Sequence, residues 1–434
     1  MKVGIIADDL TGANDTGVQF ARNGLNTYVL MSNEQPTKTD IDVLVIDTDS
    51  RALSAKEAYQ QVKQTSELIK KIGPELIYKK LDSTMRGNIG AELEAVYDSF
   101  RPDFAIIAPG YPKNNRTVEN GKLFIGGRPL AQTEFALDPK TPVRESSIVE
   151  ILKKESGKKV AMITKQDLEK GEAHVLEKMK AHYHEGTHFI VFDSTTEEDL
   201  KNIVSHVRKA NYQVIWSGSA GLANYILEEK MKTGKPEEHW NGESGNQVLM
   251  VVGSVNRNSR RQLEKVLKDP TVKGIKLYSH KVLRKEESAG EIERVMNAVK
   301  EAIEGNFDIV LYSSGNPEEI KQAQEVGARI GLAPTLVSDR ISETLGMAAA
   351  EIVKKYGVDR LFLTGGDTAK KACLSMGINE FKLLDEVEIG IPIGILVHEK
   401  EIVMVTKAGG FGSESSLLRS LTILRGDKKI CAQL

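Results

Sequence analysis

Apolar and polar positions follow two alternating patterns along the first half of the chain. Short runs of β-branched and aliphatic residues predict buried strands, and longer segments with an apolar residue every three or four positions predict amphipathic helices. The predicted strands are Val3–Ala7, Val43–Asp47, Leu76–Tyr78, Phe104–Ala108, Val160–Ile163, Phe189–Phe192 and Val214–Trp216. The predicted helices are Ala55–Lys71, Ile89–Phe100, Asp167–Tyr183 and Glu197–Ala210. This alternation is typical of a mostly parallel sheet covered by helices on both faces.

A polar, glycine-containing stretch interrupts the pattern after Ile226. It predicts an interdomain linker over residues 231–247, which leaves a first domain of residues 1–230 and a second of residues 248–434. The strands predicted in the second domain are Val248–Val252, Ile275–Tyr278, Ile309–Tyr312, Leu361–Leu363, Ile393–Leu396 and Ile402–Val405. The helices predicted there are Arg257–Leu267 and Ala289–Ile303. The predicted fold class is α/β, with two doubly wound domains and mostly parallel sheets.

One long stretch, from Pro109 to about Pro142, follows neither pattern and is rich in glycine and proline. Loops of this length inside a compact domain are usually functional, or else they contain elements that the pattern has missed. We expect this stretch to be an excursion that lines a site.

Composition narrows the classes of function. Lys and Arg number 59 against 61 Asp and Glu, so the formal net charge of −2 offers no sequence-wide positive field for nucleic acid or an anionic membrane. No run of about 18 apolar residues predicts a membrane span. Two cysteines among 434 residues exclude a disulfide framework and favour the cytoplasm. A cytosolic enzyme or binding protein for a small molecule is expected.

Three polar segments directly follow predicted strands, where open α/β sheets bind ligands. They are Asp8-Asp9-Leu10-Thr11-Gly12-Ala13-Asn14-Asp15, then Asp47-Thr48-Asp49-Ser50-Arg51, and Lys79-Lys80-Leu81-Asp82-Ser83-Thr84-Met85-Arg86-Gly87-Asn88. Carboxylates there can orient a hydroxyl, and a guanidinium can hold a carboxylate bidentately. The alternatives are helix caps at Asp9 or Thr11 and at Asp82 to Thr84, and a local pairing of Arg51 with Asp47 or Asp49.

Four glycine-containing turns follow strands of the second domain. They are Gly253-Ser254, Ser313-Ser314-Gly315-Asn316, Thr364-Gly365-Gly366-Asp367-Thr368 and Lys407-Ala408-Gly409-Gly410-Phe411-Gly412. Backbone N–H groups in such turns can approach phosphate oxygens, so the set predicts a nucleotide site. Neither G-x-x-x-x-G-K-[ST] nor an early G-x-G-x-x-G occurs, which disfavours a P-loop protein and a dehydrogenase. Cys373 is expected to be a small core residue.

The Asp8–Asp15, Lys80–Asn88, Gly253-Ser254 and Thr364–Thr368 motifs together resemble those of the four-carbon acid sugar kinase family, over essentially the whole chain. The resemblance implies a sugar-acid domain followed by an ATP-binding domain, with the active site in the cleft between them. It implies phosphorylation by ATP of a terminal hydroxyl of threonate, erythronate or 3-oxo-tetronate. The Pro109–Pro112 segment also looks like the family's loop, whereas the Lys113–Thr117 segment departs from it and leaves the substrate subtype open.

The residues that the resemblance assigns fall into two groups. The substrate group is Asp9, Arg51, Lys80, Asp82, Ser83 and Thr84, to which we add Arg86 from its charge and position; the nucleotide group is Ser254, Thr364, Gly365, Gly366, Asp367 and Gly410, with Gly409 beside it. We expect Asp9 or Asp82 to accept the proton of the attacking hydroxyl, while Arg51 and Lys80 neutralise the carboxylate. Mg²⁺ is expected on the phosphates, with Asp367 as a candidate outer ligand.

Two other functions stay open at this stage. A kinase for another small hydroxy acid, such as glycerate, would share the scaffold, and a sugar-acid sensor that responds to a nucleotide would bind both ligands without transfer. A homodimer is a fair expectation for a metabolic enzyme of this size.

Overall fold

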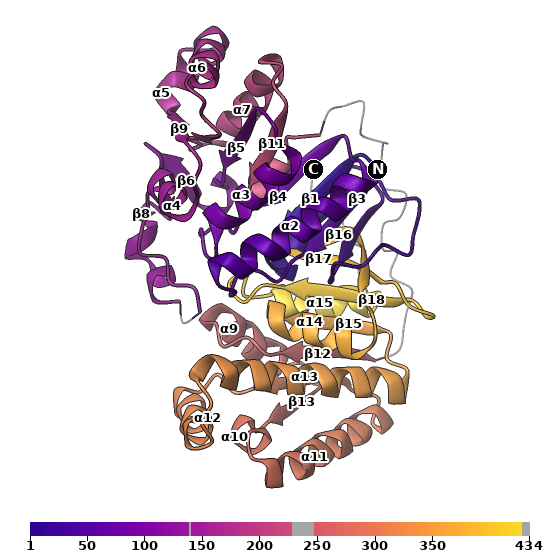
Figure 1. The fold of residues 1–434 in the computed structure, drawn as a ribbon. Helices are drawn as coiled ribbons and strands as arrows, with labels where there is room; N and C mark the ends of the chain where they lie inside the picture. Colours follow the sequence, from indigo (N-terminus) through magenta and orange to yellow (C-terminus); the bar gives the residue numbers. More distant parts are fainter. Residues whose placement is uncertain (139, 228–246, 428–434) are drawn as a thin grey trace. The chain divides into compact units, whose positions relative to one another are not determined.

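The computed structural model describes residues 1–138, 140–227 and 247–427, shown as a ribbon in Figure 1. The chain divides into two compact units, Met1–Lys235 and Pro236–Leu434. The linker predicted for residues 231–247 lies, except for Gln247, outside the described residues.

The N-terminal unit is built on a parallel sheet whose strand order is β2-β3-β1-β4-β11-β5-β10-β9. Its strands are β1 (Val3–Ala7), β2 (Thr27–Leu30), β3 (Val43–Asp47), β4 (Leu76–Lys80), β5 (Phe104–Ala108), β9 (Val160–Ile163), β10 (Phe189–Phe192) and β11 (Val214–Gly218). Every strand predicted from the sequence is present, and β2 is an addition. The sequence pattern did not mark β2, although β9 and β10 are equally short.

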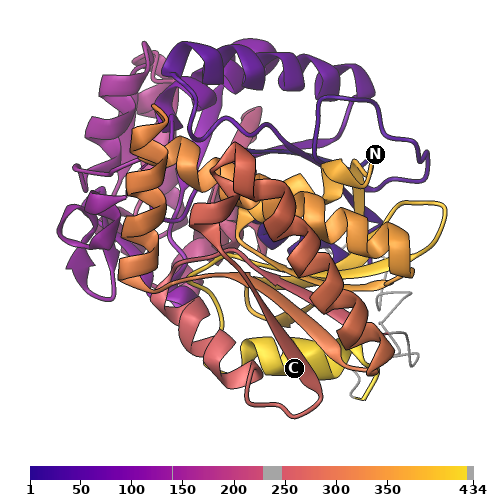
Figure 2. The ribbon, with the colours of Figure 1, turned by 90° about the horizontal axis from the view of Figure 1, so that it is seen from below.

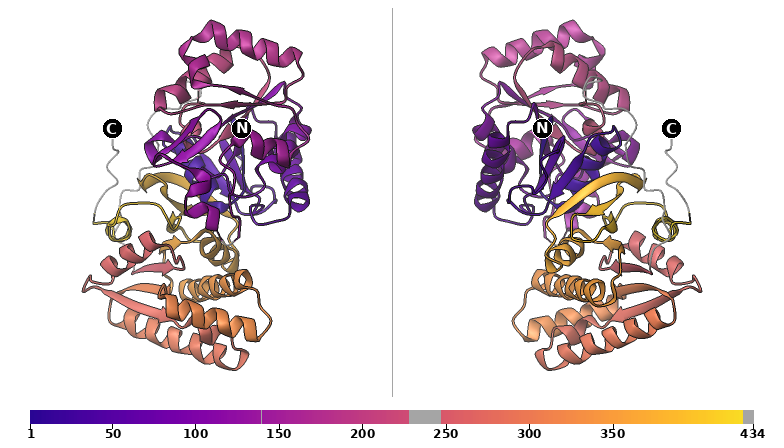
Figure 3. Two further views of the ribbon diagram at one scale, coloured as in Figure 1. Left: turned by 90° about the vertical axis from the view of Figure 1, so that its left-hand side faces the viewer. Right: turned by 90° about the vertical axis from the view of Figure 1, so that its right-hand side faces the viewer.

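Helices flank this sheet on both sides, as Figure 3 shows, which confirms the predicted fold class. They are α1 (Leu10–Ala21), α2 (Ala55–Ile72), α3 (Ile89–Phe100), α4 (Ile148–Glu155), α5 (Lys165–Glu169), α6 (Glu172–His184), α7 (Glu197–Lys209) and α8 (Ala220–Ala223). The single helix predicted for Asp167–Tyr183 is wrong. Thr164 caps α5, and Gly171, at φ 89°, ends that segment and starts α6 in a new direction.

The stretch from Pro109 to Pro142 contains elements that the apolar pattern missed, which is the alternative left open for it. It contains a small antiparallel sheet of β6 (Arg116–Glu119), β7 (Lys122–Ile125) and β8 (Arg128–Pro129), with short 3₁₀ turns η1 (Pro112–Asn114), η2 (Leu130–Gln132) and η3 (Glu134–Leu137). Val118 and Leu123 pack into the core below β5 and β10. Charged end residues in β6 and β7, and the two-residue length of β8, leave too little apolar periodicity for these strands to be found from sequence.

The C-terminal unit contains a sheet ordered β13-β14-β12-β15-β18-β17-β16. Its strands are β12 (Val248–Val252), β13 (Val272–Leu277), β14 (Asp308–Ser313), β15 (Arg360–Thr364), β16 (Glu380–Glu388), β17 (Ile391–Leu396) and β18 (Ile402–Lys407). The first five in the order are parallel, and β17 and β16 are antiparallel additions. The sequence missed β16, in which charged residues interrupt the apolar pattern.

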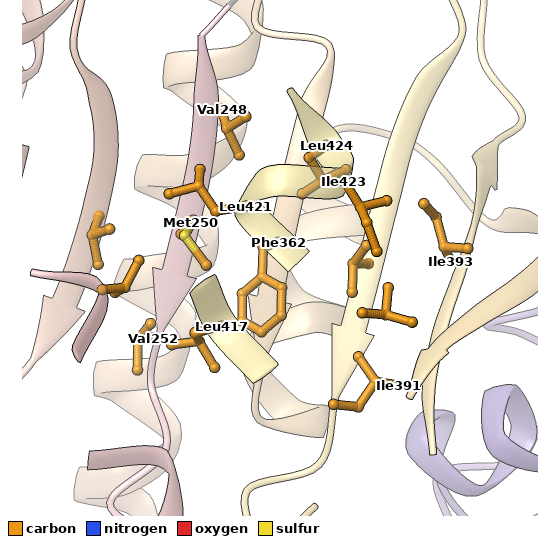
Figure 4. Packing of buried hydrophobic residues seen from close by; sticks show 14 of the residues in the cluster. Val248, Met250, Val252, Phe362, Ile391, Ile393, Leu417, Leu421, Ile423 and Leu424 are labelled. Carbon is orange, nitrogen blue, oxygen red and sulfur yellow. The ribbon is translucent and has the colours of Figure 1, made fainter. Parts of the chain in front are cut away.

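The helices of this unit are α9 (Arg257–Val266), α10 (Ser279–Val282), α11 (Lys285–Glu304), α12 (Pro317–Arg329), α13 (Pro334–Tyr356), α14 (Gly366–Ser375) and α15 (Ser416–Leu424). In Figure 2, α9 and α15 lie on one side of the sheet and the longer helices on the other. On the α9 and α15 side, β12 contributes Val248, Met250 and Val252, which pack with Phe362 and Leu421 (Figure 4). Cys373 is a fully buried core residue of α14, as expected.

The two sheets share a connection pattern that locates their ligand sites. The orders β2-β3-β1-β4 and β13-β14-β12-β15 are equivalent, although the sequence shows no repeat. In each, the connection after the first strand runs toward one edge, and the connection after the fourth runs toward the other. The direction therefore reverses between β1 and β4, and between β12 and β15. Such switch points, at the carboxyl ends of the strands, are where doubly wound sheets bind ligands.

Candidate functional site

Arg51 joins two carboxylates at the switch point of the N-terminal unit. Its Nε and Nη2 donate to Asp8 at 2.6 and 2.9 Å, and its Nη1 donates to Asp9 Oδ2 at 2.6 Å. Arg51 thus donates to two carboxylates that directly follow β1, and not to Asp47 or Asp49 as the local alternative predicted. Because three nitrogens of the guanidinium already donate to protein carboxylates, Arg51 mainly fixes the geometry of Asp8 and Asp9 in this structure.

The segment after β4 folds around Asp82. Thr84 Oγ1 donates to Asp82 Oδ2 at 2.5 Å, and Arg86 holds both carboxylate oxygens at 2.6 and 3.3 Å. Arg51 Nη2 lies 3.9 Å from Asp82 Oδ1, which links the two clusters. Ser83, which lies between Asp82 and Thr84 in sequence, is half-buried. The structure thus brings the predicted residues of β1, β3 and β4 to one edge of the sheet.

Lys80 approaches the start of α1 because position 12 is glycine. A Cβ there would lie 2.7 Å from Asp9 Oδ1 and 2.9 Å from Lys80 Nζ. Asp9 Oδ1 also accepts the N–H of Gly12 at 2.8 Å and caps α1, so the cap and the site are the same carboxylate. The sequence offered a helix cap and a site residue as alternatives for Asp9, and in the structure the two are compatible.

A buried ion pair lies beside these residues and connects the elements that carry them. Lys79 Nζ lies 2.7 Å from Glu92 Oε2 of α3, with both side chains almost inaccessible. Ser50 Oγ donates to Glu92 Oε1 at 2.8 Å, which attaches the turn that carries Arg51. Because one carboxylate connects β4, α3 and this turn, Glu92 positions the site without lying among its predicted residues.

The carboxylates of the cluster differ in proton affinity. Burial and the neighbouring charges of Asp8 and Asp82 raise the pKa of Asp9, against the opposing effect of Arg51. Burial also raises the pKa of Asp82, but Arg86 and Arg51 outweigh it and hold that pKa well below its ordinary value. Asp9 is therefore the better proton acceptor of the two.

Two further residues near the cluster were not among the predicted site residues. Asp15, on α1, is 7% exposed, and its Oδ1 has no hydrogen-bond partner among the described residues. Burial raises its pKa to about 6, with Lys80 and Arg116 acting in the opposite direction. Arg116, on β6, has a buried Nε that likewise lacks a described partner. The motif pointed to Asp15, whereas nothing local in the sequence marked Arg116.

In the C-terminal unit, the predicted nucleotide residues converge on the end of β12. A Cβ on Gly409 would lie 2.4 Å from Ser254 Oγ, and one on Gly365 would lie 3.8 Å from Ser254 N. Gly365 has φ 97°, a conformation that favours glycine. Thr364 is buried at the end of β15, and Gly366 and Asp367 open α14. The turns after β12, β15 and β18 thus lie side by side.

The turn at residues 408–413 has its carbonyl groups fixed from one side. Lys407 Nζ donates to the carbonyl oxygens of Ala408, Gly409 and Phe411 at 2.8–3.1 Å. Two side chains of α9 donate to carbonyl oxygens in the same turn. Asn258 Nδ2 lies 2.9 Å from the carbonyl oxygen of Gly412, and Gln262 Nε2 lies 2.7 Å from that of Ser413. With its acceptors engaged, the turn leaves the N–H groups of the glycines for an anion.

No cluster of three or more His, Cys, Asp or Glu side chains with metal-binding geometry occurs within residues 1–138, 140–227 and 247–427. Mg²⁺ commonly binds through one or two carboxylates and the substrate's phosphates, and Asp367, exposed at the start of α14, fits that role. None of the helices in the described part of the chain combines the length and hydropathy that a bilayer span requires.

Two family models match the chain in tandem. The model described as a sugar-binding N-terminal domain matches residues 3–226, and the model described as a nucleotide-binding C-terminal domain matches residues 249–417. The chain is 33% identical to D-threonate kinase of Salmonella typhimurium, over 97% of this chain and 98% of the relative. The chain belongs to the four-carbon acid sugar kinase family.

Other members of the family show the same full-length similarity. D-erythronate kinase of Heliobacterium modesticaldum is 30% identical over 95% of this chain and 94% of its own, and 3-oxo-tetronate kinase of Actinobacillus succinogenes is 27% identical over 95% and 97%. A crystal structure of a Haemophilus influenzae protein matches with a TM-score of 0.75 at 25% identity, over 97% of this chain and all of that chain. A Salmonella typhimurium structure, at 24% identity and a TM-score of 0.81, covers 96% and 98% and shows the same fold.

Proposed function

We propose that this protein is an ATP-dependent kinase that phosphorylates the terminal hydroxyl of a four-carbon sugar acid such as threonate, erythronate or 3-oxo-tetronate. The observation that carries the proposal is the 33% identity to a D-threonate kinase over nearly both full lengths. The cluster of carboxylates and cations at the β1/β4 switch point and the glycine turns at the β12/β15 switch point support it, because phosphoryl transfer depends on positioning and on neutralising charge.

In this proposal Asp9 accepts the proton of the attacking hydroxyl. Its raised pKa and its place beside Lys80 favour it over Asp82, whose carboxylate is held by Arg86. Asp82, with Thr84 and Ser83, orients the substrate's hydroxyl groups. Of the two bases predicted from the sequence, Asp9 and Asp82, we therefore propose Asp9.

The substrate's carboxylate needs a cation that protein carboxylates do not already saturate. Arg51 is held by Asp8 and Asp9, whereas Lys80 Nζ donates to the carbonyl of Leu81 at 2.9 Å, and Arg116 keeps a buried Nε without a described partner. We therefore place the carboxylate at Lys80 and Arg116, with Arg51 as the residue that holds the aspartates. The active site predicted for the cleft between the domains stays a prediction.

ATP is the proposed phosphoryl donor, held by Ser254, Thr364–Asp367 and the Gly409-Gly410 turn. Mg²⁺ would neutralise phosphate charge, and Asp367 is the residue that would face it. Action in the cytoplasm and assembly as a homodimer also belong to the proposal; fractionation and sedimentation would test them.

The test is a coupled assay of ADP release with ATP and Mg²⁺ over sugar acids of three to six carbons. Turnover of a four-carbon acid with a kcat/KM at least a hundred times that of glycerate supports the proposal. Preference for glycerate would select the other kinase. Thermal stabilisation by both ligands without ADP release would select the sensor.

A further inference from the structure

Arg260 is a largely buried arginine of α9 that lies against the end of β14. Its Nη1 donates to the carbonyl oxygen of Ser313 at 2.6 Å. A Cβ on Gly315 would lie 2.4 Å from its Nε, so the turn after β14 accommodates the guanidinium only because that position is glycine. This turn, Ser313–Asn316, is one of the four glycine-containing turns predicted for the nucleotide site, and none of its residues has yet been given a role.

Two nitrogens of Arg260 are left without partners. Nε and Nη2 are both buried, and neither has a hydrogen-bond partner among the residues that the structure describes. These are the two atoms whose N–H bonds point in parallel along one edge of the guanidinium, the edge that matches two oxygens of a carboxylate or a phosphate. Both donors of this edge of Arg260 are therefore unused within the described residues.

The charge of Arg260 is also uncompensated. Burial lowers its pKa to about 10, and the one group that acts in the opposite direction is Tyr312. Within the described part of the chain no carboxylate forms an ion pair with it, whereas Arg51, Arg86 and Arg425 each have one or more. A buried unpaired cation destabilises a fold, so its presence calls for an anion from outside the chain.

The location matches the nucleotide site. The turn after β14 adjoins the end of β12, where Ser313 Oγ contacts the carbonyl oxygen of Gly253 at 3.5 Å. Ser259, the neighbour of Arg260 on α9, donates to the carbonyl of Gly409 at 2.8 Å, so the helix that carries Arg260 also holds the glycine turn.

We propose that Arg260 binds a phosphate group of the nucleotide through Nε and Nη2, with the Ser313–Asn316 turn forming the wall of this subsite. The inference rests on the proposed nucleotide-dependent function and adds a phosphate anchor that the glycine turns alone do not supply.

The test measures ATP and ADP binding by calorimetry for the full chain and for Arg260→Met, Arg260→Lys and Arg261→Gln. Arg261 is a matched control, since it neighbours Arg260 but its side chain is 68% exposed. We expect Arg260→Met to weaken ATP binding at least tenfold and to raise the KM for ATP without changing that for the sugar acid. Its melting temperature without nucleotide should equal or exceed that of the unsubstituted protein. Arg261→Gln should bind ATP normally.

Arg260→Lys keeps the charge but loses these two parallel donors, so it should fold and bind ATP at least threefold more weakly. If the unsubstituted protein binds no nucleotide, the proposed function fails. If it binds ATP and Arg260→Met, or Arg260→Lys where the methionine variant does not fold, binds within twofold as tightly, the inference alone is overturned. A lower melting temperature of Arg260→Met with unchanged ATP affinity would assign Arg260 a structural role.

Discussion

Replacing Asp15 with asparagine should stabilise the protein at neutral pH. Asp15 is buried on α1, its Oδ1 has no described hydrogen-bond partner, and burial outweighs Lys80 and Arg116 in raising its pKa to about 6 from an ordinary value of 3.8. The unfolded chain binds its proton less tightly than the folded one does. Above pH 6, folding therefore forces an ionised carboxylate into a place that favours the protonated form.

The size and sign of the effect follow from the two pKa values. Below pH 3.8 Asp15 is protonated in both states and contributes nothing. As the pH rises from 3.8 to about 6, the folded state loses about 3 kcal/mol relative to the unfolded state, and the loss stays constant above that pH. Asparagine has no charge to bury, so the variant should gain about 3 kcal/mol at pH 7.5 and less than about 1 kcal/mol at pH 4.

Unfolding in urea, followed by tryptophan fluorescence at both pH values, measures this difference. Trp216, on β11, is buried in the N-terminal unit, and a Trp240→Phe background leaves it as the one tryptophan of the two in the chain. Asp40→Asn is the control, since Asp40 is an exposed aspartate of the same unit and should give no change. An equal gain at both pH values, or a loss at pH 7.5, would refute the reasoning.

Three further outcomes test the site. Asp9→Asn should lower kcat at least a hundredfold, whereas Asp82→Asn should act more on the KM for the sugar acid; a kcat loss confined to Asp82→Asn would reverse their roles. Arg116→Gln should raise the KM for the acid at least tenfold and leave that for ATP unchanged, and an unchanged KM for the acid would remove Arg116 from the carboxylate subsite. Glu92→Gln leaves Lys79 buried without its partner, so it should lower the free energy of unfolding by about 3 kcal/mol, and a loss below about 1 kcal/mol would show that the pair is dispensable.

The parallel strands and many helices of both units could be predicted because each carries its own periodicity. The bounds of β1, β3 and β5 agree with the sequence pattern residue for residue. The errors occur where an element is short or depends on contacts distant in sequence. The strands β6 to β8 are of this kind, because their apolar residues are fixed by packing against β5 and β10.

The site divides in the same way. Asp9, Asp82 and Ser254 each follow an apolar strand, so the rule that ligands bind at carboxyl ends was enough to find them. The partners of each residue were not predictable, since Arg51 pairs across the sheet with Asp8 and Asp9 rather than with its neighbours along the chain. Arg116, on β6, and Arg260, on α9, lie near the carboxyl ends of the strands in their own units. No local sequence motif identifies either residue.

The arginines near the two candidate sites differ in whether protein carboxylates already pair with them. Arg51 and Arg86 are paired with carboxylates, so their charges are already neutralised and their main effect is to hold Asp8, Asp9 and Asp82 in place. Arg116 and Arg260 keep buried nitrogens without described partners, and burial lowers the pKa of each. Leaving buried guanidinium nitrogens without hydrogen bonds costs stability, and a bound anion would offset that cost. The acid's carboxylate and the nucleotide's phosphate are the two anions that a sugar-acid kinase must hold, and within the described residues Arg116 and Arg260 are the arginines that we propose for them.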